Sequence, residues 1–195
     1  MFRLASAPDL TLTIRSDGLL LRAPRMDDYV DWAQLRQESR QFLAPWEPIW
    51  PLDDLTRQSF RRRMKRYHDD MVADLAYTLF IFEPSTGSLM GGLTLGNVRR
   101  GVSQSATLGY WMGQPFAGRG IMTKSVKIAT EYAFNKLGLR RIEAGCIPGN
   151  TASIRVLEAN GFEREGYAKE YLCIAGIWQD HYLYARLNRA SPSRA

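Results

Sequence analysis

The stretch GYWMGQPFAGRGIMTKSV, residues 109–126, places an apolar strand, a loop with two glycines and the start of a helix in direct succession. This order is typical of sites where a phosphate group rests on the backbone at a helix N-terminus. Gly118 and Gly120 lack a side chain, so the loop can adopt positive φ and let a ligand approach closely. The identity of that ligand is the first question that the sequence raises.

Two common nucleotide motifs fail at the same residue. A P-loop read from Gly118, GRGIMTKS, ends in Lys124 and Ser125 but has Thr123 where the motif requires its second glycine. The dinucleotide fingerprint G-x-G-x-x-G also requires a glycine at position 123. Both nucleotide sites are therefore disfavoured.

Two interpretations of the loop remain. In one, a pyrophosphate lies against the free N–H groups of residues 116–122, where the helix dipole adds positive potential and Arg119 adds a charge. In the other, the loop is a tight turn between strand and helix that holds no ligand. A lone G-x-G does not separate the two, so the surrounding pattern must.

The surrounding pattern predicts a strand, a helix and a second strand parallel to the first. Residues 103–112 read as the first strand, and RRIEAGCI, residues 140–147, as the second. The helix between them ends at Gly138 and shows one apolar stripe at helical spacing: Met122, Val126, Ala129, Ala133 and Leu137. A short helix from Asn150 to Asn160 follows, because asparagine is a good N-cap.

The rest of the chain predicts an α/β (α+β) fold with a mixed, mostly antiparallel sheet of six to seven strands flanked by helices. We expect a single domain over residues 1–195, with a core of about 18–188 and a flexible tail at 189–195. The further predicted elements are a strand at about 18–22, a helix capped by Asp27 or Asp28 and ending near Glu38, an ordered proline- and tryptophan-rich loop at 42–51, a helix at 53–74, a hairpin at 76–98, and strands at 164–174 and 178–187.

Composition narrows the class of protein without naming a function. The 195 residues carry a formal net charge of +6, which is compatible with an anionic partner but also with an ordinary basic surface. Cys146 and Cys173 lie far apart, and His68 and His181 are isolated, so the sequence predicts free thiols and no metal site. No segment approaches the length of a membrane span, and we expect a cytoplasmic protein.

The loop, the helix and the downstream NTAS…NGF pattern resemble the cofactor-binding half of the GNAT N-acetyltransferase superfamily. The family form of the loop is Q/R-x-x-G-x-G/A; here Pro115 stands at the first position and Gln114 is one place early. LLLRAPRMDD, FLAPWEP and REGYAKEYLCIAGIWQDHYLYA are similar to the ribosomal-protein-alanine N-acetyltransferases of the RimJ type. The resemblance covers about residues 19–187.

This resemblance implies that acetyl-coenzyme A (acetyl-CoA) lies where the two parallel strands separate, near Met112 and Ile147. The pantetheine arm would bond to the strand backbone, and the pyrophosphate would rest on the glycine loop. The cofactor-binding residues that the resemblance implies are Tyr110, Trp111, Met112, Phe116, Ala117, Gly118, Arg119, Gly120, Ile121, Met122 and Asn150.

The resemblance also suggests catalytic groups. Ser153 matches a serine proposed in RimJ and RimL relatives to protonate the departing sulfur, although the first turn of a helix explains a serine equally well. RimL relatives carry a glutamate where this chain has Leu172, so we predict Glu170, on the same strand face, as the general base. Glu143 and Glu47 are alternative bases.

The acceptor that the resemblance implies is a protein N-terminus, specifically the alanine of a ribosomal protein. In FLAPWEP, Trp46 would form a wall of the acceptor pocket and Glu47 would attract an ammonium group; packing of the loop on the core is the alternative. The basic cluster between Arg61 and Arg66 would contact ribosomal RNA or form an ordinary solvated helix face. Acetylation of a small amine, such as a polyamine or antibiotic, and a non-catalytic RNA-binding module remain rival functions. Monomer and homodimer are equally open.

Overall fold

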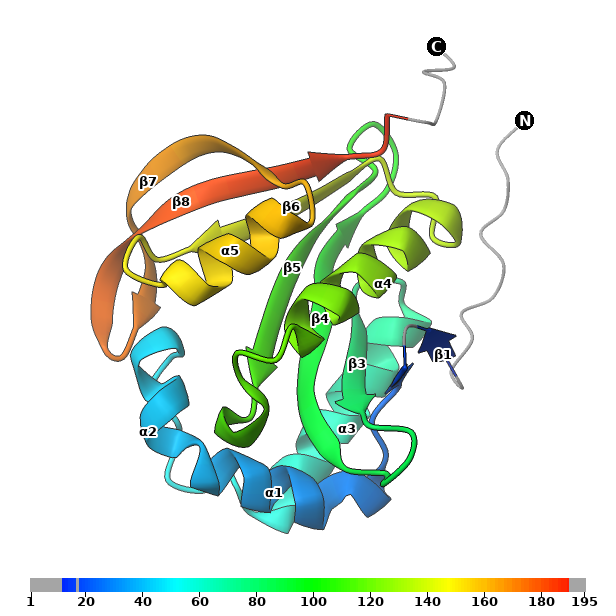
Figure 1. Ribbon diagram of the computed structural model, residues 1–195, viewed down its shortest axis with the longest axis vertical. Helices are drawn as coiled ribbons and strands as arrows, with labels where there is room; N and C mark the ends of the chain where they lie inside the picture. Colours follow the sequence, from blue (N-terminus) through cyan, green and yellow to red (C-terminus); the bar gives the residue numbers. More distant parts are fainter. Residues whose placement is uncertain (1–11, 17, 190–195) are drawn as a thin grey trace.

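A computed structural model describes residues 12–16 and 18–189, and these form one sheet of eight strands covered by helices (Figure 1). Most of the predicted tail, residues 190–195, lies outside the described residues. The strands are β1 (Thr13–Ser16), β2 (Leu19–Arg22), β3 (Tyr77–Phe82), β4 (Leu89–Arg99), β5 (Ser105–Met112), β6 (Arg141–Cys146), β7 (Glu163–Ile174) and β8 (Ile177–Leu187). We predicted six to seven strands, and the additional one is the short edge strand β1.

The sheet order is β1-β2-β3-β4-β5-β6-β8-β7, and among these strands one neighbouring pair, β5 and β6, is parallel. The other pairs are antiparallel. This agrees with the predicted mixed, mostly antiparallel sheet. A parallel pair needs a crossover, and the helix after the glycine loop supplies it.

Four of the described α-helices follow the predicted pattern with small shifts at their ends, whereas the short helix α2 (Arg40–Leu43) was not predicted and overlaps the start of the predicted loop at 42–51. The α-helices are α1 (Tyr29–Glu38), α2, α3 (Arg57–Val72), α4 (Ile121–Asn135) and α5 (Thr151–Ala159), with 3-10 turns η1 (Met26–Asp28), η2 (Ala44–Trp46) and η3 (Gln114–Phe116). None of the helices in residues 12–16 and 18–189 has the length and apolar character needed to cross a bilayer.

Two predicted helix starts differ from the structure. The helix predicted from residue 53 begins at Arg57, because Thr56 accepts a hydrogen bond from the Ser59 N–H (3.2 Å) and caps it. Asp28 does not cap α1 with its side chain. Its carboxylate instead accepts the Arg25 N–H and two hydrogen bonds from the Arg22 guanidinium.

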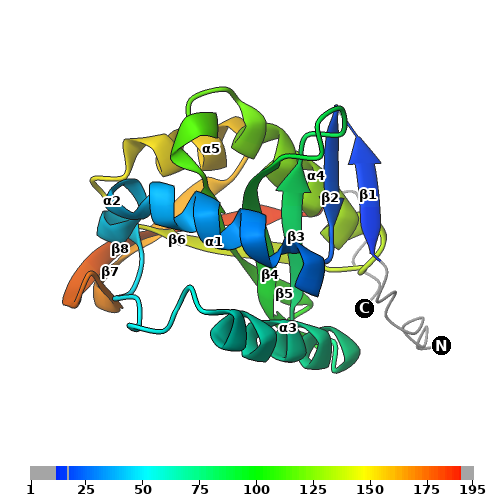
Figure 2. The same ribbon diagram turned by 90° about the horizontal axis from the view of Figure 1, so that it is seen from below.

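The helices lie in two layers. Helices α4 and α5 cover one face of the sheet and α3 lies on the other, as Figure 2 shows from below. Strand β3 is buried along its whole length because both faces are covered: Leu79 and Ile81 join the larger core, while Phe80 and Phe82 pack with Trp32 of α1 and Phe60 of α3.

The parallel pairing of β5 and β6 is short. It joins Ser105 to Arg141, Ala106 to Ile142 and Thr107 to Glu143, and extends no further. Beyond it, β5 stays paired with β4 as far as Met112, and β6 stays paired with β8 as far as Cys146. The two strands therefore separate into a V, which is visible in Figure 1.

The close approach of β4 to β5 depends on a glycine. A Cβ added at Gly91 would lie 2.5 Å from the backbone oxygen of Trp111, whereas one added at Gly96, on the same strand, would meet nothing nearer than 3.7 Å. We expect Gly91→Ala to lower the free energy of unfolding by about 1–3 kcal/mol, because the clash is with backbone, and Gly96→Ala to change it much less. Urea unfolding of both variants tests this; equal stabilities would contradict it.

Candidate active site

A cavity of about 650 Å³ opens where β5 and β6 separate. Its walls come from the end of β5, the loop that leads into α4, the start of α5, the segment around η2, and strands β6, β7 and β8. Every predicted cofactor-binding residue lines it: Tyr110, Trp111, Met112, Phe116, Ala117, Gly118, Arg119, Gly120, Ile121, Met122 and Asn150. Residues distant in sequence thus meet at one place.

The glycine loop leaves space for a ligand beside the N-terminus of α4. Gly118 and Gly120 have φ of 74° and 73°, and a Cβ at either position would meet no atom within 4 Å. Gly120 is the N-cap, and its carbonyl accepts the first helical hydrogen bond, from Lys124 N (3.1 Å). The N–H groups before Lys124 point out of the helix end and can bind an anion.

The start of the loop is held by direct contacts with the C-terminal end of α1. Ser39, fully buried at the end of α1, accepts a hydrogen bond from the backbone N–H of Gln114 (2.9 Å). Gly113 lies so close to α1 that a Cβ there would be 2.5 Å from Leu35 Cδ1. These contacts position the loop before any ligand binds.

A group of proton-carrying side chains lies at the start of α5. The Tyr110 hydroxyl is 2.8 Å from Ser153 Oγ, and Asn150 Oδ1 accepts the Ser153 backbone N–H at 3.0 Å, as predicted for an N-cap. Cys146 Sγ lies 3.7 Å from the Asn150 carbonyl. Burial raises the pKa of the Tyr110 hydroxyl and of the Cys146 thiol, so both keep their protons at neutral pH.

The far side of the cavity is aromatic, and its acidic residue is already paired. Trp46 and Glu47 line it as predicted. Both Glu47 oxygens accept hydrogen bonds from the Arg36 guanidinium (2.8 and 2.7 Å), and one also accepts Trp50 Nε1–H (2.7 Å). Arg36 stacks over the rings of Trp50 and Trp111. Glu47 therefore anchors this segment, and its charge is largely cancelled for an incoming ammonium group.

Glu170 is not brought to the cavity. A β-bulge shifts the pairing between Ala168 and Leu172, and Glu170 has φ of 46°. Its side chain is exposed and its N–H donates to Asp180, while Leu172 lines the cavity. Strand alternation predicted its face wrongly because the bulge interrupts the two-residue period. Glu143, an alternative base, forms ion pairs with Arg99 and Arg141. It lies in the segment where β5 and β6 are hydrogen-bonded, outside the cavity lining.

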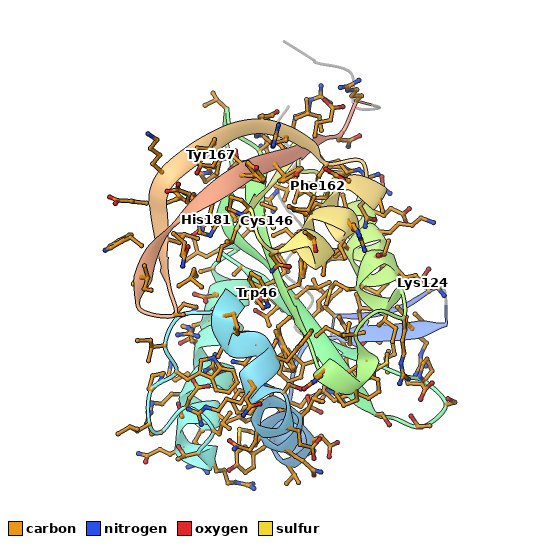
Figure 3. All side chains as sticks on the ribbon, turned by 60° about the vertical axis from the view of Figure 1, so that its left-hand side comes forward. Trp46, Lys124, Cys146, Phe162, Tyr167 and His181 are labelled. Carbon is orange, nitrogen blue, oxygen red and sulfur yellow. The ribbon has the colours of Figure 1, made fainter. Side chains whose placement is uncertain are left out.

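His181 and Cys146 line the cavity although the sequence interpretation assigned them no role. Figure 3 labels both residues, on β8 and β6, together with Trp46. His181 is 3% exposed, and its Nδ1 lies 2.9 Å from the Gln179 carbonyl oxygen. A histidine inside the aromatic strand WQDHYLYA was the available signal, but only packing shows which face it occupies.

Comparison with known proteins agrees with this geometry. The sequence profile described as "Acetyltransferase (GNAT) domain" matches residues 18–163, three quarters of the chain. The chain belongs to the GNAT acetyltransferase family. It is similar to the probable N-acetyltransferase YjcK of Bacillus subtilis (35% identity over 90% of this chain and 97% of YjcK). It is also similar to the [ribosomal protein uS5]-alanine N-acetyltransferase of Escherichia coli (33% identity over 93% of this chain and 92% of the relative).

A solved relative connects the fold to a ligand. RimJ of Mycobacterium smegmatis, in complex with CoA-disulfide, superposes with a TM-score of 0.86 at 32% identity and covers 95% of this chain and 90% of its own. This chain is thus a GNAT N-acetyltransferase, and a solved relative of it binds a CoA compound. The open space over Gly118 and Gly120 fits a pyrophosphate. No cluster of potential metal ligands occurs among residues 12–16 and 18–189.

Two glycines allow a matched test of the pyrophosphate position. Gly120 and Gly138 both have φ near +70° and open space at Cβ, so a side chain adds similar backbone strain at each. Only Gly120 lines the cavity. We expect Gly120→Glu to weaken CoA binding more than 100-fold in calorimetric titration, because a carboxylate would face the pyrophosphate, and Gly138→Glu to bind within about threefold of wild type. Equal affinities would place the cofactor elsewhere.

Proposed function

We propose that this GNAT chain transfers acetyl from acetyl-CoA to the N-terminal α-amino group of a protein, such as the alanine of a ribosomal protein. The observation that carries the proposal is the acceptor side of the cavity. This side is built from apolar and aromatic side chains, among them Phe42, Trp46, Leu172 and Ile174. The carboxylate on this side among the described residues, Glu47, is paired with Arg36. The relatives named for ribosomal-protein alanine acetylation support the same acceptor class.

The paired state of Glu47 argues against polyamines and other multiply charged small amines. Such substrates carry several positive charges and are attracted by clefts with uncompensated carboxylates. Among the described residues, three charged side chains line the cavity: the acidic Glu47 and the basic Arg119 and Arg155. A single amino group followed by an uncharged chain fits this lining better.

An α-amino group also needs less assistance from a base than a lysine side chain does. Its pKa is about 7.7–8.0, against about 10.4 for a lysine side chain, so a sizeable fraction is already unprotonated near neutral pH. Acetyl-CoA supplies an activated acetyl thioester. The protein has to hold the amine against it, exclude water and handle the protons.

The described residues divide these tasks between the two faces of the sheet. The backbone of Tyr110, Trp111 and Met112, which β6 does not pair, can bind the pantetheine arm as an added strand and polarise the carbonyl oxygen. Ser153, hydrogen-bonded to Tyr110, lies on the α5 side and can protonate the departing sulfur. The acceptor approaches from the side of Trp46.

The contacts of the basic cluster on α3 favour a solvated helix face over an RNA-binding surface. Arg62 pairs with Asp53, Arg63 pairs with Asp54, and Lys65 pairs with Asp69. Much of the charge between Arg61 and Arg66 is therefore matched locally, which reduces the number of cations available to phosphates.

A transfer assay tests the function. Purified protein is incubated with acetyl-CoA and with peptides that begin with Ala, Ser or Met, and products are identified by mass spectrometry. We expect a mass gain of one acetyl group, mapped to the α-amine, with the same peptides blocked at the N-terminus as controls. Acetylation of spermidine or of lysine side chains in preference to α-amines would contradict the proposal.

The role of Ser153 gives a second prediction. We expect Ser153→Ala to lower kcat for peptide acetylation about 10²-fold with little change in CoA affinity, because proton donation to the sulfur is lost while the Asn150 cap acts on the backbone N–H and survives. Ser153→Thr, which keeps the hydroxyl, should retain more activity than the alanine variant. Equal kcat for wild type and Ser153→Ala would assign the proton to another donor.

A further inference from the structure

We infer that His181 is the proton acceptor for the attacking amine, a catalytic role that rests on the proposed acetyl transfer. The sequence analysis did not assign this role to His181. The base that it predicted, Glu170, lies outside the cavity. His181 is buried, lines the cavity and lies on β8 next to Tyr182, which forms the last pair with β6 (Cys146) on the open side of the V. It is therefore placed beside the position where the thioester would meet the acceptor.

The face of the sheet on which His181 lies is the acceptor face. Cys146 points to the start of α5, so its neighbour Gly145 faces the opposite side. A Cβ added at Gly145 would be 3.5 Å from His181 Cδ2, which places the imidazole directly over that glycine. Ser153 is on the α5 side, so the proton donor to sulfur and the proton acceptor from nitrogen would act from opposite faces.

The hydrogen bonding of the ring defines which nitrogen is available. The carbonyl of Gln179 can only accept, so the Nδ1 that lies 2.9 Å from it carries the hydrogen. The neutral ring then has its lone pair on Nε2. No described hydrogen bond involves Nε2, so this nitrogen remains available to accept a proton.

The titratable groups around His181 are few. Tyr171 of β7 packs against the ring at a centroid distance of 5.6 Å, and Asp180 precedes it on β8. Asp180 accepts hydrogen bonds from Tyr167 and from the Glu170 N–H, which lower the pKa of its carboxyl. The β6 residue next to the ring is Gly145, which has no titratable side chain. The acidic residue that lines the cavity, Glu47, is paired with Arg36.

The protons balance in this scheme. The acceptor ammonium gives one proton to His181 Nε2, and the freed lone pair forms the N–C bond to the acetyl carbon. The C–S bond breaks with its electron pair on sulfur, which takes a proton from the Ser153 hydroxyl. The nitrogen also loses a second proton, which restores the Ser153 hydroxyl. The proton on His181 Nε2 then passes to solvent. One proton is released for each acetyl group transferred.

The test compares His181→Gln with His68→Gln, the same substitution at an exposed histidine of α3. The ratio of kcat/KM between wild type and His181→Gln for an Ala-initial peptide is measured from pH 7 to pH 9. We expect a ratio of about 10² at pH 7 that falls about tenfold by pH 9, because the amine, with a pKa near 8, then loses its proton without help. The His68→Gln variant should match wild type throughout.

Two further measurements separate this role from a structural one. CoA affinity and the thermal midpoint of His181→Gln should remain close to wild type, and nitrogen-15 NMR of the wild type should show His181 protonated at Nδ1. A ratio that stays constant with pH, or a ring protonated at Nε2 in the neutral form, would overturn the inference while leaving acetyl transfer intact. Absence of transfer by the wild type to any α-amine would overturn the proposed function, and the role of His181 with it.

Discussion

The parallel pairing of β5 with β6 ends after three residue pairs, and the site depends on that ending. Each strand stays bound to its other neighbour, β5 to β4 and β6 to β8, so the strands separate without breaking the sheet. The backbone of β5 beyond Thr107 has no partner on the β6 side, which would be costly if it were buried without hydrogen bonds. A ligand that binds in the V with its own polar groups would form hydrogen bonds with these backbone groups.

The V also makes the sheet a divider between two chemical environments. On the α4 and α5 side, the glycine loop, Tyr110 and Ser153 form a surface suited to the anionic and thiol ends of a cofactor. On the other side, the paired Glu47 anchors an aromatic wall. The Glu47 carbonyl also accepts the N–H of Ala175, which ties the β7–β8 turn to this wall. In the proposed reaction, the cofactor and the acceptor would meet through the opening between the strands.

Local patterns predicted the fold to a large extent. The apolar stripe of α4, the Asn150 cap and the hairpin of β3 and β4 were each visible in the sequence, because short-range periodicity and capping determine them. The errors arose where local rules have exceptions. The two-residue alternation placed Glu170 in the site, but the bulge in β7 turns it outward, and an isolated edge strand such as β1 gives too little periodicity to detect.

By itself the sequence predicted the glycine loop and the cap of α5, because a loop at a helix N-terminus and its cap involve groups that lie close together along the chain. Gly118, Gly120 and Asn150 were predicted from these local patterns and from the family resemblance. Only the tertiary structure decided how the opposite wall of the cavity is built. Arg36 and Glu47 are eleven positions apart on a helix and a loop, and His181 reaches the same cavity from the end of the chain. Which charges cancel and which ring nitrogen stays free depends on packing between these distant segments.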